Sequence, residues 1–137
     1  FSKFVSIPVI SDDSGLCIKS LNNKPGIYSA RLAKKNGSFT KAMKVILKRL
    51  KTKKNRSAYF ICSLSYKYPR KKTVTVTGKI NGKIAHRISG KNGFGYDPIF
   101  IPKNYKKTFA EMAKFKKIHM DHRYIAFKKL KKKIKTL

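Results

Sequence analysis

The clearest hydrophobic pattern in the sequence lies between Phe39 and Leu50. Apolar side chains recur there every three or four residues and lysines fill the gaps, which predicts an amphipathic helix. Residues 58–66 alternate between apolar and polar side chains, a pattern that predicts a half-buried strand. Residues 73–85 are rich in Val, Ile and Thr and predict another strand, in which Asn81-Gly82 fits either a hairpin turn or a bulge.

The segment before the predicted helix is less regular. Residues 7–10 predict a short buried strand that runs into a polar turn at residues 11–15. Residues 16–18 resume an apolar run, and residues 22–26 have the composition of a loop.

Two helix starts carry capping signals. Thr108 and Glu111 have the spacing of a capping box, which gives Glu111 a structural role. Asp121 is a good N-cap for a final helix, whose lysine-rich residues 128–135 we expect in solvent. The side chains expected to point inward from this helix are Phe127, Leu130, Ile134 and Leu137.

Strand and helix patterns alternate over residues 1–137, which predicts a single domain. The fold class we expect is α/β or α+β, with a mixed, twisted β-sheet flanked by helices.

Charge changes this picture less than its size suggests. There are 35 basic residues against five acidic ones, a formal net charge of +30. Most of the basic residues are lysines spread along the whole chain, whereas readers of bases and phosphates favour the planar fork of arginine. We interpret most of the lysines as solvated surface and expect no nucleic-acid partner, with polyanion binding as the alternative.

The remaining composition points to a cytoplasmic protein. No apolar run approaches the roughly 18 residues of a membrane helix, and no signal peptide is visible, so we expect no membrane partner. Cys17 and Cys62 lie in apolar segments without metal-binding spacing, so we interpret them as core residues in a reducing compartment.

Asp12 and Asp13 are the only adjacent carboxylates in the chain. Paired carboxylates after a buried strand suit Mg²⁺, and one of them could accept a proton from water. The alternative is a turn in which the aspartates bind their own backbone.

Two other segments are candidates for ligand binding. Residues 90–98 combine glycines with Phe94 and Tyr96, whose rings could stack on a base; the alternative is a turn held by core aromatics. His122 and Arg123, at the predicted helix start downstream of Lys117, are donors for a phosphate or a carbonyl; the alternative is a capped, solvated helix end.

Six motifs follow one another in a characteristic order. They are SDDSGL (residues 11–16), KPGIYSAR (24–31), YFICSL (59–64), NGFGYDPIFIP (92–102), KTFAEM (107–112) and a lysine followed by His-Arg (117–123). In this order they resemble the inosine-triphosphatase family, the non-canonical purine NTP pyrophosphatases, over nearly the whole chain.

The resemblance implies a role for each matching residue. Asp13 would be the proton acceptor and a Mg²⁺ ligand, supported by Asp12, and Ser14 would touch the nucleotide. The implied base-binding residues are Phe94, Gly95, Tyr96, Asp97, Lys117, His122 and Arg123. The implied reaction is Mg²⁺-assisted attack of water on the α-phosphate of ITP, dITP or XTP, which releases the monophosphate and pyrophosphate. The family also implies a homodimer.

The sequence departs from the family pattern in two places. Asp121 stands where the family usually has serine, and the family's opening strand, Thr/Ser-Gly-Asn-x-x-Lys loop and metal-sharing glutamate are not in this sequence. Residues 1–5 resemble the end of the helix that precedes the DDSG strand. We therefore expect the domain to be N-terminally incomplete. We also expect residues 1–137 alone to hydrolyse ITP poorly or not at all. The alternatives are a catalytically impaired relative and a basic nucleic-acid-binding module.

Overall fold

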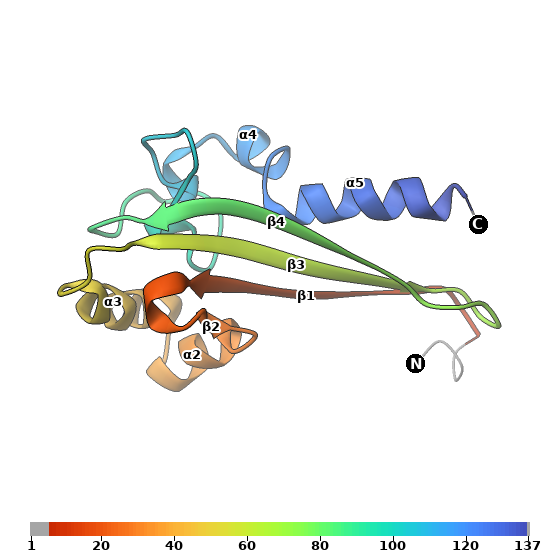
Figure 1. Cartoon of the computed structure of the whole chain (residues 1–137), viewed down its shortest axis with the longest axis horizontal. Helices are drawn as coiled ribbons and strands as arrows, with labels where there is room; N and C mark the ends of the chain where they lie inside the picture. Colours follow the sequence, from red (N-terminus) through yellow and green to blue (C-terminus); the bar gives the residue numbers. More distant parts are fainter. Residues whose placement is uncertain (1–5, 137) are drawn as a thin grey trace.

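A computed structural model describes residues 6–136, which form one five-stranded sheet in the order β2-β1-β3-β4-β5 (Figure 1). The strands are β1 (Val9–Ile18), β2 (Lys24–Gly26), β3 (Ser57–Lys67), β4 (Val74–Ile84) and β5 (Phe100–Pro102). The α/β class and the helix-flanked sheet are confirmed. All pairings among these residues are antiparallel, where we had expected a mixed sheet, because β3 and β4 form a hairpin and β1 runs against β3.

Two of the α-helices begin at residues whose side chains cap them. The Ser38 hydroxyl accepts a hydrogen bond from Lys41 N, and the Asp121 carboxylate accepts one from Tyr124 N. Thr108 and Glu111 form the predicted capping box. The α-helices are α2 (Ser29–Asn36), α3 (Phe39–Leu50), α4 (Lys114–Ile118) and α5 (His122–Ile134), and the 3₁₀ turns are η1 (Lys19–Leu21), η2 (Asp97–Ile99) and η3 (Phe109–Glu111). Among residues 6–136, none of these helices has the length and the hydrophobicity that spanning a lipid bilayer requires.

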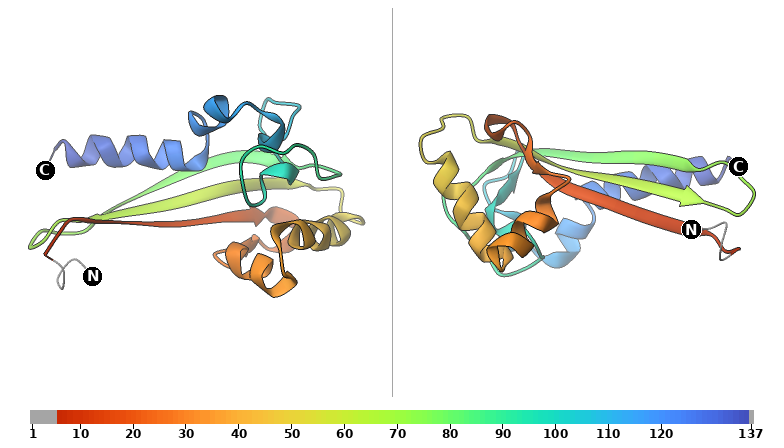
Figure 2. Two further views of the ribbon diagram at one scale, coloured as in Figure 1. Left: turned by 180° about the vertical axis from the view of Figure 1, so that it is seen from behind. Right: turned by 90° about the horizontal axis from the view of Figure 1, so that it is seen from below.

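The two faces of the sheet differ in what covers them. We call the face that carries Leu16, Phe60 and Cys62 the inner face, because these side chains are buried against helices. Helices α2 and α3 gather at one end of the long strands, and α5 runs along the other end (Figures 1 and 2). The opposite face, which we call the outer face, carries alternate residues such as Asp13 and Lys79.

Close packing of α5 on the inner face depends on one glycine. A Cβ atom at Gly78 would collide with the backbone of His122 and Ala126. The missing side chain lets the first turns of α5 approach β4, and Ala126 and Leu130 are buried against Cys62.

The structure corrects five further details of the sequence-based predictions. Residues 11–15 are not a turn but the middle of β1, since each pairs with β3. Ile10 is exposed, so the strand at residues 7–10 is not buried. The pairing of β4 with β3 runs through Asn81 and Gly82 without a turn or bulge.

The fourth detail concerns α5. Phe127 is exposed because only a narrow stripe of this helix meets the sheet, formed by the buried Ala126 and Leu130 and the partly buried Ile134. Leu137 and residues 1–5 lie outside the described residues. Residues 22–26, expected to be a loop, end in the short edge strand β2, which pairs with β1.

Candidate active site

Three predicted motifs meet around one small cavity on the inner face. Its volume is about 130 Å³. The predicted site residues that line it are Ser14, Phe94, Gly95, Tyr96, Asp97, His122 and Arg123. Strand β1 supplies Ser14, the segment before η2 supplies the aromatics, and the first turn of α5 supplies His122 and Arg123. Lys117 lies behind Phe94, with its Nζ 4.6 Å from the centre of that ring.

A buried ion network supports the floor of this cavity. Lys117 Nζ lies 3.0 Å from Asp97 Oδ2 and 3.4 Å from Asp121 Oδ2, and all three side chains are nearly inaccessible to solvent. Burial raises the pKa of Asp97 more strongly than the neighbouring Lys117 lowers it. Asp97 also accepts a hydrogen bond from Phe94 N, which fixes the loop that carries the Phe94 ring.

This loop needs a glycine at position 93. Gly93 has φ of +72°, and a Cβ atom there would collide with the Asp97 carboxylate. The network is therefore bonded at two places. Asp97 accepts the backbone N–H of Phe94, and Asp121 caps the start of α5.

Ser29 is a structural centre of the site that sequence reasoning missed. Its hydroxyl accepts a hydrogen bond from Leu16 N and donates one to Gly26 O. Its backbone carbonyl accepts a 2.6 Å hydrogen bond from the Tyr96 hydroxyl, and burial raises the pKa of Tyr96 to about 12. Tyr96 therefore serves as a buried strut rather than as an open stacking surface. The only signal for Ser29 was its place within the KPGIYSAR motif.

His122 is buried with one ring nitrogen free. The imidazole stacks on Phe60 with 4.8 Å between ring centres, and Nδ1 has no hydrogen-bond partner among residues 6–136. Burial lowers the pKa of His122 to about 4, so the ring is neutral at pH 7. A neutral imidazole offers one donor and one acceptor to a ligand in the cavity.

Arg123 and Phe94 form the open rim. Phe94 is 61% exposed, and the Arg123 guanidinium lies 5.1 Å from the centre of its ring. Arg123 Nε donates a 2.8 Å hydrogen bond to Asp12 Oδ2, and Ser14 Oγ donates one to Asp12 Oδ1. Burial raises the pKa of Asp12, but the hydrogen bonds from Ser14 and Arg123 outweigh it and hold the pKa below its ordinary value.

The two adjacent aspartates do not form a chelating pair. Neighbouring residues on a strand point to opposite faces, so Asp12 faces Arg123 while Asp13 faces outward. Asp13 is exposed and has no hydrogen-bond or ion-pair partner among residues 6–136. Among residues 6–136, no group of three or more His, Cys, Asp or Glu side chains is arranged so that it could hold a metal ion. A hard cation such as Mg²⁺ therefore fits Asp13 alone, completed by water and by phosphate.

Known proteins are similar to this chain over the segments that form the candidate site. The model of the Ham1 family matches residues 1–133. A dITP/XTP pyrophosphatase of Bacillus subtilis is 44% identical over 133 residues, which are 96% of this chain and 67% of that protein. A protein of the same name from Clostridium tetani is 39% identical over 128 residues, 93% of this chain and 64% of its own length. The chain thus spans about two thirds of the length of these curated relatives.

Solved structures give the same answer for the fold. The structure of the Staphylococcus aureus Ham1 protein matches with a TM-score of 0.92 and 39% identity, over 98% of this chain and 70% of that one. A HAM1 protein from Coxiella burnetii matches with a TM-score of 0.92 and 34% identity, over 99% of this chain and 71% of that one.

Proposed function

The chain belongs to the Ham1 family, and its motifs resemble the inosine-triphosphatase family. We therefore propose that it hydrolyses non-canonical purine nucleoside triphosphates. The substrates would be ITP, dITP and XTP, and the products the monophosphate and pyrophosphate. Two curated relatives carry the name dITP/XTP pyrophosphatase, which supports this choice. The structural observation that carries the proposal is the cavity lined by Arg123, the exposed Phe94 ring and His122, whose Nδ1 has no hydrogen-bond partner among residues 6–136.

The base would bind on the inner face. The exposed ring of Phe94 offers a stacking surface, and Arg123 and the neutral His122 offer donors at its edge. Hypoxanthine and xanthine present a carbonyl oxygen at C6, where adenine presents an amino group. An adenine would therefore set a donor against a donor and leave buried groups unpaired, which discriminates strongly.

Hydrolysis would depend on Asp13. Its exposed, unpartnered carboxylate can orient a water molecule for attack on the α-phosphorus and accept the proton that the water loses. The bond between the α-phosphorus and its bridging oxygen then breaks, and pyrophosphate leaves. Mg²⁺, when bound at Asp13, would offset the negative charge of the phosphates. We propose that Asp12 instead positions Arg123, since its oxygens already accept hydrogen bonds from Arg123 and Ser14.

A pyrophosphate-release assay tests the proposal. The protein should cleave ITP, dITP and XTP at least about 100-fold more efficiently than ATP. Asp13→Asn should lower kcat about 10²- to 10⁴-fold without changing the melting temperature, because Asp13 is exposed and supports no contact. Ser11→Ala, on the same face of β1, is the matched control and should leave kcat unchanged. Equal turnover of ATP, or full activity of Asp13→Asn, contradicts the proposal.

We also propose that the protein is cytoplasmic and forms a homodimer. The free, buried thiols of Cys17 and Cys62 fit a reducing compartment. The dimer rests on the family resemblance. Light scattering at micromolar concentration tests it, and a monomeric mass would contradict it.

A further inference from the structure

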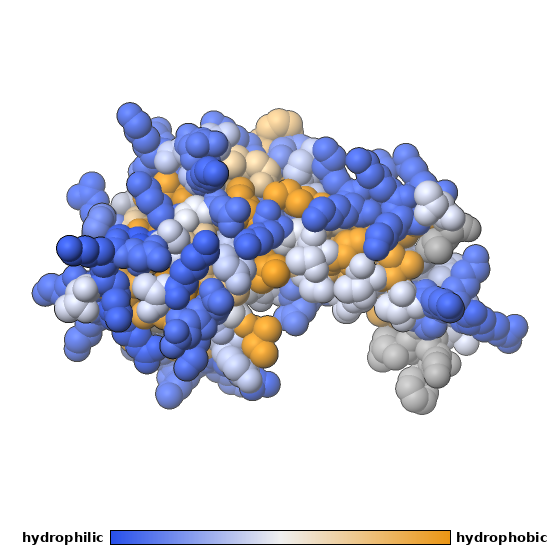
Figure 3. All heavy atoms as spheres, viewed as in Figure 1, coloured by the Kyte–Doolittle hydropathy of each residue, from blue (hydrophilic) through white to orange (hydrophobic). Residues whose placement is uncertain are grey.

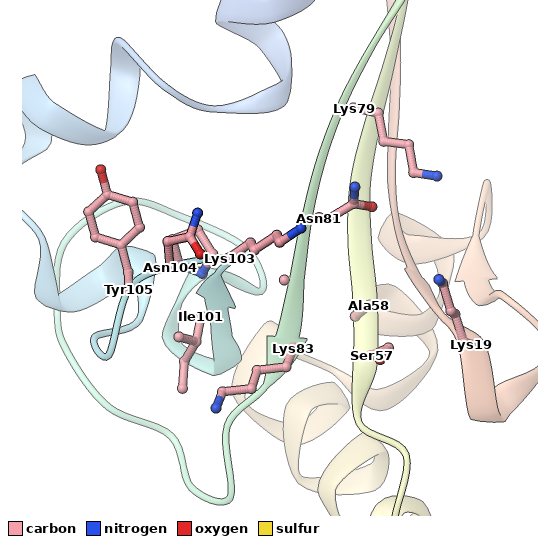
Figure 4. Close-up of a pocket in the computed structure, with 12 residues that line it drawn as sticks. Lys19, Ser57, Ala58, Lys79, Asn81, Lys83, Ile101, Lys103, Asn104 and Tyr105 are labelled. Carbon is pink, nitrogen blue, oxygen red and sulfur yellow. The ribbon is translucent and has the colours of Figure 1, made fainter.

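The outer face carries a second concavity that shares no residue with the candidate active site. Its volume is about 560 Å³. We call it the basic groove and define it by Lys19, Lys79, Asn81, Lys83, Lys103 and Tyr105, all of which are exposed (Figure 4). From the geometry of this groove we infer that it binds single-stranded nucleic acid through the phosphate backbone.

Three segments of the chain bring the lysines together. Lys79 and Lys83 lie on one face of β4, four residues or about 13 Å apart along the strand. Lys103 follows β5, and its backbone N–H donates to Asn81 O, which holds that segment against β4. Lys19 begins η1 beyond the other side of β3 (Figure 4). The positive charge therefore extends across three strands, farther than one phosphate group reaches.

No acidic side chain within residues 6–136 forms an ion pair with these lysines, although Lys79 Nζ lies 4.1 Å from the centre of the Tyr59 ring. Ion pairs within residues 6–136 involve only Lys117 and Arg123 as cations, and none of the five acidic residues lines the groove. Hydrophilic side chains cover much of the face seen in Figure 3, and the sequence has 35 Lys and Arg residues, so charge alone does not distinguish the groove. The groove differs in that four lysines from three segments line one concavity of about 560 Å³, whereas a concavity of about 260 Å³ on α5 is lined by Lys128, Lys129 and Lys132 of a single helix.

The groove also has the other components of a single-strand site. Grooves of this kind combine cations with aromatic rings on which bases stack, and Tyr105 is exposed at the rim. Asn81 and Asn104 can bond to sugars or base edges without selecting one base. The groove lining contains no arginine, so we expect little sequence preference. The even spread of the lysines along the sequence argued against a nucleic-acid partner, but the fold gathers four of them.

A pair of charge-matched variants tests the inference. In the first, Lys19, Lys79, Lys83 and Lys103 are all replaced by Gln. In the second, Lys128, Lys131, Lys132 and Lys133, which are exposed on α5, are replaced by Gln. Both variants carry the same reduced charge. The probe is a fluorescent oligouridylate of about 12 nucleotides, within the site size of such grooves.

The groove variant should bind the probe at least about tenfold more weakly, and its plot of log K against log salt should be shallower by about 0.7 for each phosphate that the variant no longer neutralises. The α5 variant should stay within about twofold of the parent, apart from a general charge effect. Equal weakening in the two variants would overturn the inference, because binding would then follow overall charge. Equally tight binding of a polyglutamate peptide through the same lysines would also overturn it and indicate an acidic protein partner.

Folding and enzyme activity are separate readouts. Circular dichroism checks each variant, and Lys79→Gln/Lys83→Gln and Lys19→Gln/Lys103→Gln divide the change if the quadruple variant does not fold. Each double variant should show about half of the change in salt slope, and an unchanged slope in both overturns the inference. Cleavage of dITP should be unchanged, because no groove residue lines the cavity on the inner face.

Discussion

The inner and outer faces of the same sheet carry their charged side chains in opposite environments. On the inner face, Asp97, Lys117 and Asp121 are buried and bonded to one another. On the outer face, Asp13 and Lys79 are exposed, and Asp13 has no polar partner within residues 6–136. Recognition of a base requires fixed donors, whereas a phosphate chain with its counterions requires charges that are still available. Base specificity and charge binding are therefore assigned to the two sides of one sheet, and on β1 these sides are a single residue apart, at Asp12 and Asp13.

Among the substitutions that test the contrast between the two faces, Lys117→Met should have the largest effect. It leaves two carboxylates buried without a cation, and we expect a loss of about 3–5 kcal/mol in the free energy of unfolding. Lys79→Met on the outer face is the control and should change stability by less than about 0.5 kcal/mol. Urea denaturation measures both. A cost for Lys79→Met as large as that for Lys117→Met would abolish the distinction between the faces.

A second test uses pH. The pKa of His122 falls from 6.5 to about 4 on folding, so between these values the unfolded chain binds a proton that the folded chain does not. Stability contributed by neutral His122 is therefore complete above pH 6.5 and is lost as the pH falls toward 4, by on the order of 3 kcal/mol. His122→Gln should flatten this part of the stability profile measured by urea titration. An unchanged slope would show that His122 is not responsible.

Gly78→Ala tests how closely α5 is packed on the inner face. The added methyl would meet the backbone of His122 and Ala126, and we expect a destabilisation of about 1–3 kcal/mol. Thr77→Ala, one residue earlier and on the outer face, should cost less than about 0.5 kcal/mol. Thermal denaturation of the two variants compares them. A neutral Gly78→Ala would mean that α5 can move away from β4.

The smallest effect is expected at the boundary between the faces. Asp12→Asn removes a half-exposed ion pair with Arg123 and should cost only about 0.2–1 kcal/mol. The fold-change in KM for dITP should exceed the fold-change in the equilibrium constant for unfolding, because Arg123 loses its orientation. Calorimetry and steady-state kinetics measure the two quantities. A large loss of stability with unchanged KM would make Asp12 a structural residue.

Much of the fold was predictable because local signals and packing agree. The period of Phe39–Leu50 places α3, and the cap at Asp121 places the start of α5. The prediction of a turn at residues 11–15 was wrong. Asp, Ser and Gly favour turns, but ten consecutive pairings of β1 with β3 impose a strand. Phe127 misled because the narrow contact of α5 with the sheet is a property of the fold.

The candidate site divides in the same way. The order of the motifs, through its resemblance to the inosine-triphosphatase family, points to His122, Arg123 and Asp97, whereas residue types alone leave a capped, solvated helix end as the alternative for His122 and Arg123. The opposite directions of Asp12 and Asp13 follow from strand alternation, but only once the segment is known to be a strand. The role of Ser29 was out of reach, since its bond to Tyr96 joins residues 67 positions apart.

That separation has a consequence for the order of folding. The contact between Arg123 and Asp12 closes a loop of 111 residues, and the contact between Tyr96 and Ser29 closes one of 67. Contacts this distant form slowly, after the local helices and the β3–β4 hairpin. The cavity should therefore be among the last parts of the molecule to assemble. A partly folded chain can already display the lysines of β4 while it still lacks a pocket that could select a base.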